Sequence, residues 1–109
     1  MNPSVRLQQI LHEYREGLSE VLGDRLDAVV LYGSQARDEA RGADSDIDVL
    51  CVMRGPFDYG EAMDRTAELT ARISLENDTV LSLVFATREK YEKSGLPFYM
   101  NVRKEGISV

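Results

Sequence analysis

The sequence predicts an α/β (α+β) fold in which helices flank a small mixed sheet in a two-layer arrangement. Three apolar runs of strand length, at 26–32, 46–53 and 79–86, alternate with stretches of helical periodicity. Such alternation around one core is typical of sheets covered by helices. Because 109 residues suffice for one core, we expect residues 1–109 to form a single domain.

The first helix is predicted by apolar residues that recur along one helical face. Asn2-Pro3 or Ser4 opens this helix, and Gly23 ends it. His12 lies off the apolar stripe, so we interpret it as a solvated surface residue. The stripe consists of Leu7, Ile10, Leu11, Tyr14, Leu18, Val21 and Leu22.

A second amphipathic helix follows the second apolar run. Asp58 and Glu61 have the spacing of a capping box, and the helical pattern continues to about Leu75. The inner face is predicted to hold Ala62, Met63, Thr66, Leu69, Thr70 and Ile73.

Two short helices are expected after the third strand. Thr87 can cap one that extends to Lys93, and another runs from Pro97 to Lys104 and ends at Gly106. The apolar residues of the last helix admit two interpretations, either ordinary core or a patch that contacts a partner. They are Phe98, Tyr99 and Met100.

Composition and charge exclude several classes of protein. The single cysteine, Cys51, rules out an internal disulfide, and its apolar strand predicts a buried, inert thiol. We expect a cytoplasmic protein with no membrane partner, because no apolar run is long enough to span a bilayer and no signal peptide is evident. The net charge is −6 and no basic stripe is present, so we expect no direct contact with nucleic acid.

A Gly-Ser pair and two carboxylates give the sequence its functional pattern. The first apolar run stops at Gly33-Ser34, where glycine allows close approach to an anion and serine can cap a helix whose free N–H groups favour phosphate. In a strand, Asp46 and Asp48 would share a face, ~6.6 Å apart along the chain. Two such carboxylates can share a hard divalent cation, so the pattern predicts a site for a metal-bound nucleoside triphosphate.

Each part of this pattern also has an ordinary structural explanation. Gly33-Ser34 could be a simple turn, Asp46 a turn residue and Asp48 an acid at a sheet edge. The combination favours a site, because strand interiors disfavour aspartate.

The run Gly-Ser-Gln-Ala-Arg…Asp-Ser-Asp-Ile-Asp-Val-Leu resembles the Gly-Ser…Asp-x-Asp signature of the DNA-polymerase-β-like nucleotidyltransferase superfamily. Over nearly its whole length, the chain is similar to the minimal nucleotidyltransferase (MNT) family. Members of that family are often the antitoxin partners of HEPN-domain toxins.

The resemblance implies a role for each matching residue. Asp46 and Asp48 would be the catalytic metal ligands, for two Mg²⁺ ions or for one, and Gly33 and Ser34 would hold the β- and γ-phosphates of ATP. Arg37, one helical turn past Ser34, could be a further phosphate donor, although a solvated arginine would have the same spacing. Arg41 is a weaker candidate because it lies in the loop.

The chain departs from the superfamily at the third carboxylate. That residue comes from the neighbouring strand, where this sequence has Ser82, which can neither bridge metals as a carboxylate does nor act as a base near neutral pH. Asp78 would lie ~13 Å away along the strand. Glu76 is further away, and Glu89 lies beyond the strand. The third ligand is therefore missing, or it comes from the partner or the substrate.

Two functions follow from this pattern. The first is a Mg²⁺-dependent nucleotidyltransferase that moves a nucleoside monophosphate, AMP from ATP, onto a hydroxyl of a partner protein, as the antitoxin of a HEPN/MNT toxin–antitoxin pair. The alternative is a catalytically weak nucleotide-binding module that neutralises its toxin by direct contact. Ser82 favours the alternative, whereas the intact Gly33, Ser34, Asp46 and Asp48 favour the enzyme and argue against a third, purely structural role.

Overall fold

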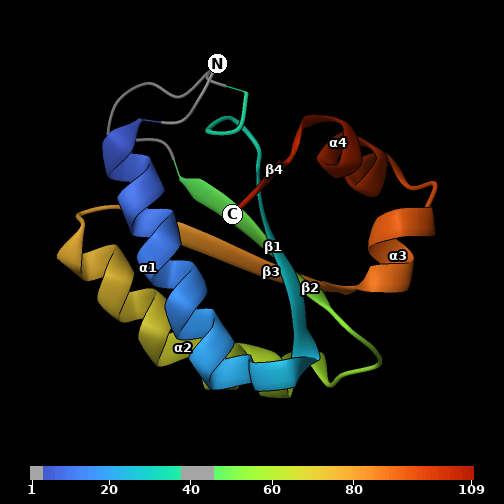
Figure 1. Cartoon of the computed structure of the whole chain (residues 1–109), viewed down its shortest axis with the longest axis horizontal. Coiled ribbons are helices and arrows are strands. Elements are labelled where there is room, and N and C mark those ends of the chain that lie inside the picture. The colour runs from blue at the N-terminus through green and yellow to red at the C-terminus, as the bar shows by residue number, and fades with distance from the viewer. Residues whose placement is uncertain (1–3, 38–45) are drawn as a thin grey trace.

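The computed structural model describes residues 4–37 and 46–109. Its sheet has the strand order β3-β2-β1-β4, with β1 (Leu26–Tyr32) and β2 (Ile47–Met53) at the centre (Figure 1). β1 is antiparallel to β2 and to the short edge strand β4 (Ile107–Ser108), whereas β2 is parallel to β3 (Leu81–Thr87). The expected mixed sheet flanked by helices is confirmed.

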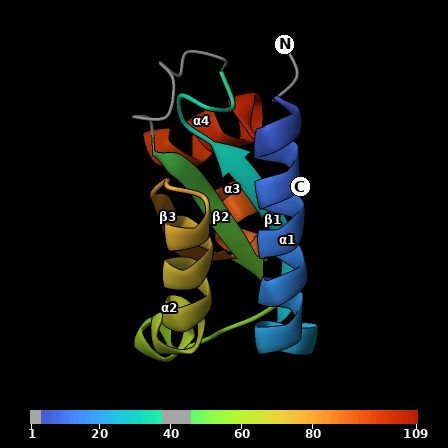
Figure 2. The same cartoon turned by 90° about the vertical axis from the view of Figure 1, so that its left-hand side faces the viewer.

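Helices cover both faces of this sheet (Figure 2). The long helices α1 (Val5–Leu22) and α2 (Tyr59–Glu76) lie side by side on one face. The shorter α3 (Arg88–Lys93) and α4 (Pro97–Glu105) lie on the other. The larger apolar core lies under α1 and α2, and α3 and α4 cover part of the opposite face over a smaller core. Because β1 and β2 contribute to both cores, their sequences are apolar almost throughout.

Three helix starts were correctly predicted from capping residues. The Ser4 hydroxyl accepts the Leu7 N–H at 3.1 Å. The Asp58 carboxylate accepts the Glu61 N–H at 2.9 Å, which completes one half of the capping box. Thr87 accepts the Lys90 N–H at 3.2 Å.

Several predicted boundaries and positions were wrong. β2 begins at Ile47 and β3 at Leu81, so Asp46 immediately precedes its strand. Met63 was assigned to the inner face of α2 but is 39 % exposed, because the buried stripe is narrower than predicted. That stripe holds only Ala62, Thr66, Leu69 and Ile73.

The C-terminal part of the chain differs most from expectation. Phe98 and Met100 are 40 % and 53 % exposed, so the interpretation of this stretch as ordinary core was wrong for both. Strand β4, which pairs with Val30 and Leu31, was not predicted, because two residues are too few to show alternation. The α4 terminus at Gly106 was predicted correctly.

Two single-residue predictions are confirmed. Cys51 is fully buried in β2, and burial raises the pKa of its thiol to about 12. His12 is exposed on α1 and lies 3.1 Å from Glu16. No helix within the described ranges is long and apolar enough to cross a membrane.

Candidate nucleotide site

Three polar side chains form a row across the sheet on the face covered by α4. Asp48 is paired in register with Tyr32 on β1 and with Ser82 on β3. Residues directly opposite one another point to the same face, and each of these three is half-buried. The expectation that Ser82 lies beside Asp48 on the neighbouring strand agrees with this register.

Gly33 packs directly against the Asp48 carboxylate. Its φ is +76°, a conformation that L side chains rarely adopt, and a Cβ at this position would lie 2.3 Å from Asp48 Oδ2. Any larger residue would therefore both strain the turn and displace the carboxylate. The Gly-Ser turn and the acidic strand are thus in direct contact, as the sequence pattern predicts for a single site.

After Gly33 the backbone makes one tight turn. The N–H groups of Ala36 and Arg37 both donate to the Gly33 carbonyl, at 3.1 and 3.2 Å. Ser34 is half-buried inside this turn. Residues 38–45, which include Arg41, lie outside the described residues.

The electrostatics of the row disfavour negative charge. Burial raises the pKa of the Asp48 carboxyl, the charge of Asp46 raises it further, and the Arg37 guanidinium acts in the opposite direction. Burial also raises the pKa of Tyr32 to about 12, with a smaller contribution from Asp48. A bound cation beside Asp48 would therefore relieve the repulsion from Asp46.

Arg37 is exposed but lies close to the acidic pair. Its Nη1 is 3.2 Å from Glu105 Oε2, which links the turn to α4. Its charge also lowers the Asp48 pKa, so Arg37 lies near enough to the carboxylate to act on it electrostatically. The structure thus brings Arg37 together with Gly33, Ser34, Asp46 and Asp48.

The alternative third carboxylates are not at the site. Asp78 lies in the turn before β3, with φ of +50°, and not on the strand face that had been assumed. Glu76 is the last residue of α2, and Glu89 lies in α3. Across the ranges 4–37 and 46–109, no three His, Cys, Asp or Glu side chains are grouped so that they could hold a metal ion.

The donor set nevertheless suits a hard cation. Asp46 and Asp48 offer carboxylate oxygens, the ligands that Mg²⁺ prefers, and Mg²⁺ usually takes only one or two protein carboxylates with water and phosphate oxygens as its other ligands. The repulsion between Asp46 and Asp48 also favours a bound cation.

Sequence reasoning missed a cavity of about 210 Å³ between the Gly33 turn and α4. Tyr32 could have been noticed, because it immediately precedes Gly33 in the motif. Phe98 was singled out only as core or a contact patch, and Asn101 and Glu105 carry no sequence signal, because only the folded chain brings α4 to the turn. The cavity is lined by Tyr32, Gly33, Arg37, Phe98, Asn101, Val102 and Glu105.

Comparison with known proteins agrees with this geometry. The nucleotidyltransferase domain family model matches residues 8–109. The Methanocaldococcus jannaschii protein MJ0141, described as a candidate protein adenylyltransferase, is 32 % identical over 74 residues, which cover 68 % of this chain and 73 % of the relative.

Solved structures share the fold. A chain in the crystal structure of a toxin–antitoxin with AMP-PNP superposes with a TM-score of 0.59 at 18 % identity, covering 87 % of this chain and 68 % of that one. A chain in a crystal structure of the MntA-HpeT toxin–antitoxin has the same TM-score at 17 % identity, covering 90 % and 70 %. At these identities the likeness concerns the fold alone. The match across residues 8–109 shows the family: the chain belongs to the nucleotidyltransferase domain family.

Proposed function

We propose that the protein is a Mg²⁺-dependent adenylyltransferase that moves AMP from ATP onto a hydroxyl of a partner protein, a HEPN-domain toxin whose antitoxin it is. The observation that supports this proposal is the packing of the Gly33 turn on Asp48, because the turn suits a phosphate and Asp48 with Asp46 suits a divalent cation. In the transfer, the acceptor oxygen bonds to the α-phosphorus, the bond to the β-phosphate breaks, pyrophosphate leaves and the hydroxyl proton passes to solvent.

Each site residue has a separate task in this proposal. Gly33 and Ser34 bind the β- and γ-phosphates through the backbone and hydroxyl of the turn. Arg37 donates to the same phosphates once it exchanges Glu105 for them. Asp46 and Asp48 hold Mg²⁺, which when bound supplies charge stabilisation for the phosphates.

The nucleotide and the acceptor are inferred from relatives. MJ0141 is described as a candidate protein adenylyltransferase, and AMP-PNP, an ATP analogue, accompanies one structural neighbour. Two of the structural neighbours come from toxin–antitoxin crystal structures. These names support ATP as the donor and a toxin as the protein that receives AMP.

One observation favours a second function, namely a weak or inactive module that binds nucleotide and neutralises its toxin by contact. Ser82 is paired in register with Asp48 and supplies no charge there, where the family resemblance implies a third carboxylate. Two carboxylates can bind one Mg²⁺ with ATP, whereas a second metal would require a further ligand.

A transfer assay separates the two functions. The chain is incubated with Mg²⁺, ATP labelled at the α-phosphate and a HEPN toxin encoded beside it, and label on the toxin is measured together with toxin activity. We expect Asp46→Asn/Asp48→Asn to reduce labelling by about 10³-fold or more. Asp64→Asn, an exposed change on α2, is the matched control and should label normally.

Two results would contradict adenylyl transfer. The first is that wild-type protein leaves the toxin unlabelled. A double variant that still neutralises the toxin would assign neutralisation to contact, which is the second function.

A further inference from the structure

We infer that the cavity between the Gly33 turn and α4 binds the adenine base of the nucleotide and that Asn101 selects adenine. This inference rests on the proposed nucleotide site and names its base-binding part. Gly33 and Arg37 line the cavity, and both are also assigned to the phosphates in the proposed function. A nucleotide whose phosphates lie on the turn therefore has its base within reach of the cavity.

The size of the cavity suits one ring system. Its volume of about 210 Å³ is below the ~300–1,000 Å³ of clefts that enclose a whole small molecule. The triphosphate would lie outside it, over the turn and the carboxylates. The motif residues bind only the phosphates and the metal, so the cavity supplies the binding site for the base.

Two aromatic rings of the lining offer a stacking surface. The Tyr32 and Phe98 rings meet edge to face, with centroids 5.3 Å apart and planes at 83°. Phe98 remains 40 % exposed although it is large and apolar. A base stacked on this ring would cover it, which gives the exposed side chain a function that ordinary core packing does not.

Asn101 is the lining residue able to distinguish bases. Its amide offers one donor and one acceptor side by side, the pattern that pairs with adenine N7 and N6. Within the described residues, the Asn101 side chain makes no hydrogen bond. Glu105, the other polar side chain that α4 contributes to the lining, is already paired with Arg37.

The test compares Mg²⁺-dependent binding of ATP, GTP and inorganic tripolyphosphate by calorimetry. Wild-type protein should bind ATP more tightly than both other ligands. Phe98→Ala should weaken ATP binding by roughly tenfold. Asn101→Asp presents two acceptors, which fit the adjacent N–H donors of guanine, so it should lower the ratio of ATP to GTP affinity by roughly fivefold to hundredfold.

Both variants should leave tripolyphosphate affinity unchanged. Lys104→Gln is the matched control for Asn101→Asp, because it changes the charge of α4 by the same amount at an exposed position that does not line the cavity. An unchanged ATP-to-GTP ratio in Asn101→Asp, or equal wild-type affinity for ATP and tripolyphosphate, would overturn the inference and leave the proposed function standing. Failure of all three ligands to bind would overturn both.

Discussion

Two half-buried aspartates, one at each end of strand β1, lie in contrasting electrostatic surroundings. Asp27 lies near the start of β1, and Asp48 is paired with Tyr32 at its end. Both belong to the sheet, and neither is freely solvated. We interpret Asp27 as an acid that stabilises the fold and Asp48 as an acid of the candidate nucleotide site.

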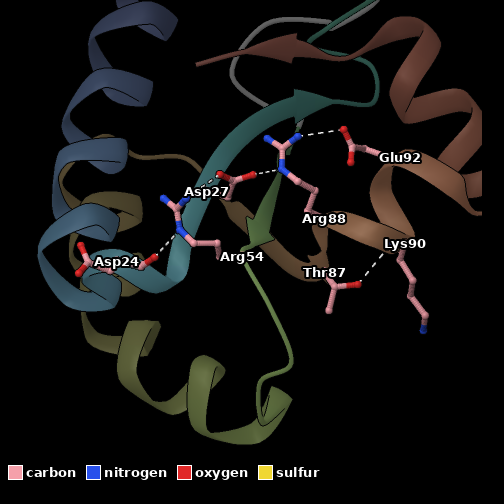
Figure 3. Close-up of polar contacts among 7 residues, drawn as sticks. All are labelled: Asp24, Asp27, Arg54, Thr87, Arg88, Lys90 and Glu92. Atoms are coloured by element: carbon pink, nitrogen blue, oxygen red, sulfur yellow. Dashed lines mark hydrogen bonds and ion pairs between the residues drawn. The ribbon is translucent and has the colours of Figure 1, made fainter.

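Asp27 is neutralised by two arginines (Figure 3). Its side chain is 13 % exposed, its Oδ1 is 3.5 Å from Arg54 Nη1, and its Oδ2 accepts a hydrogen bond from Arg88 Nε. Arg54 also donates to the Asp24 carbonyl at 2.8 Å, and Arg88 pairs with Glu92 at 2.9 Å. This network joins β1, the end of β2 and α3, and its charges are internally satisfied.

Asp48 has a second carboxylate as its neighbour. Burial and Asp46 raise its pKa, and Arg37, the cation that offsets them, is itself bonded to Glu105. An arrangement that disfavours the ionised acid in the free protein is destabilising by itself, and it becomes favourable when a cation binds. We therefore expect the Asp27 end of β1 to stabilise the free protein and the Asp48 end to destabilise it.

Among single substitutions, the largest effect is expected from Gly33→Ala. The added Cβ would collide with Asp48 Oδ2 in a turn already at positive φ, so Mg²⁺-dependent ATP binding should fall by roughly hundredfold. Gly23→Ala is the matched control, because Gly23 also has positive φ, +58°, but a Cβ there meets no atom within 4 Å. Calorimetry should find normal ATP affinity in Gly23→Ala; equal losses in both variants would show that strain alone is responsible.

Ser82→Asp should have the next largest effect. A third carboxylate beside Asp48 would complete the three metal-binding carboxylates of the superfamily. Transfer of labelled AMP should therefore rise by about tenfold. The metal-free protein should at the same time melt at lower temperature, because three acids would repel one another. Ser82→Asn adds similar bulk without charge and should change neither; a rate increase in that variant would refute the explanation.

The smallest effect is expected on the free energy of unfolding, when the aspartate at each end of β1 is replaced in turn. Asp27→Asn leaves Arg54 and Arg88 without their shared carboxylate and should lower the free energy of unfolding by about 1–2 kcal/mol. Asp48→Asn removes a disfavoured charge, so stability without ligand should stay equal or increase. Urea denaturation measures both, and a larger loss in Asp48→Asn would contradict the comparison.

The sequence predicted the parts of this molecule that are encoded locally. Capping by Ser4, Asp58 and Thr87 and the apolar strands follow from neighbouring residues, and so does the Gly33 turn next to an acidic strand. The Arg37–Glu105 pair and the cavity under α4 depend on residues far apart in the chain, which only the register and packing bring together. The sequence left Phe98 open between core and a contact patch, since an amphipathic pattern does not tell a core from an exposed binding surface.

Calorimetry with ATP, in the presence and absence of Mg²⁺, tests the central claim that Asp46 and Asp48 form the metal–nucleotide site. The experiment uses wild-type protein, Asp46→Asn/Asp48→Asn, and Asp27→Asn as the control for losing an aspartate from β1. We expect binding that requires Mg²⁺, that is lost in the double variant and that persists in Asp27→Asn. ATP binding that is independent of Mg²⁺ or survives in the double variant would contradict it.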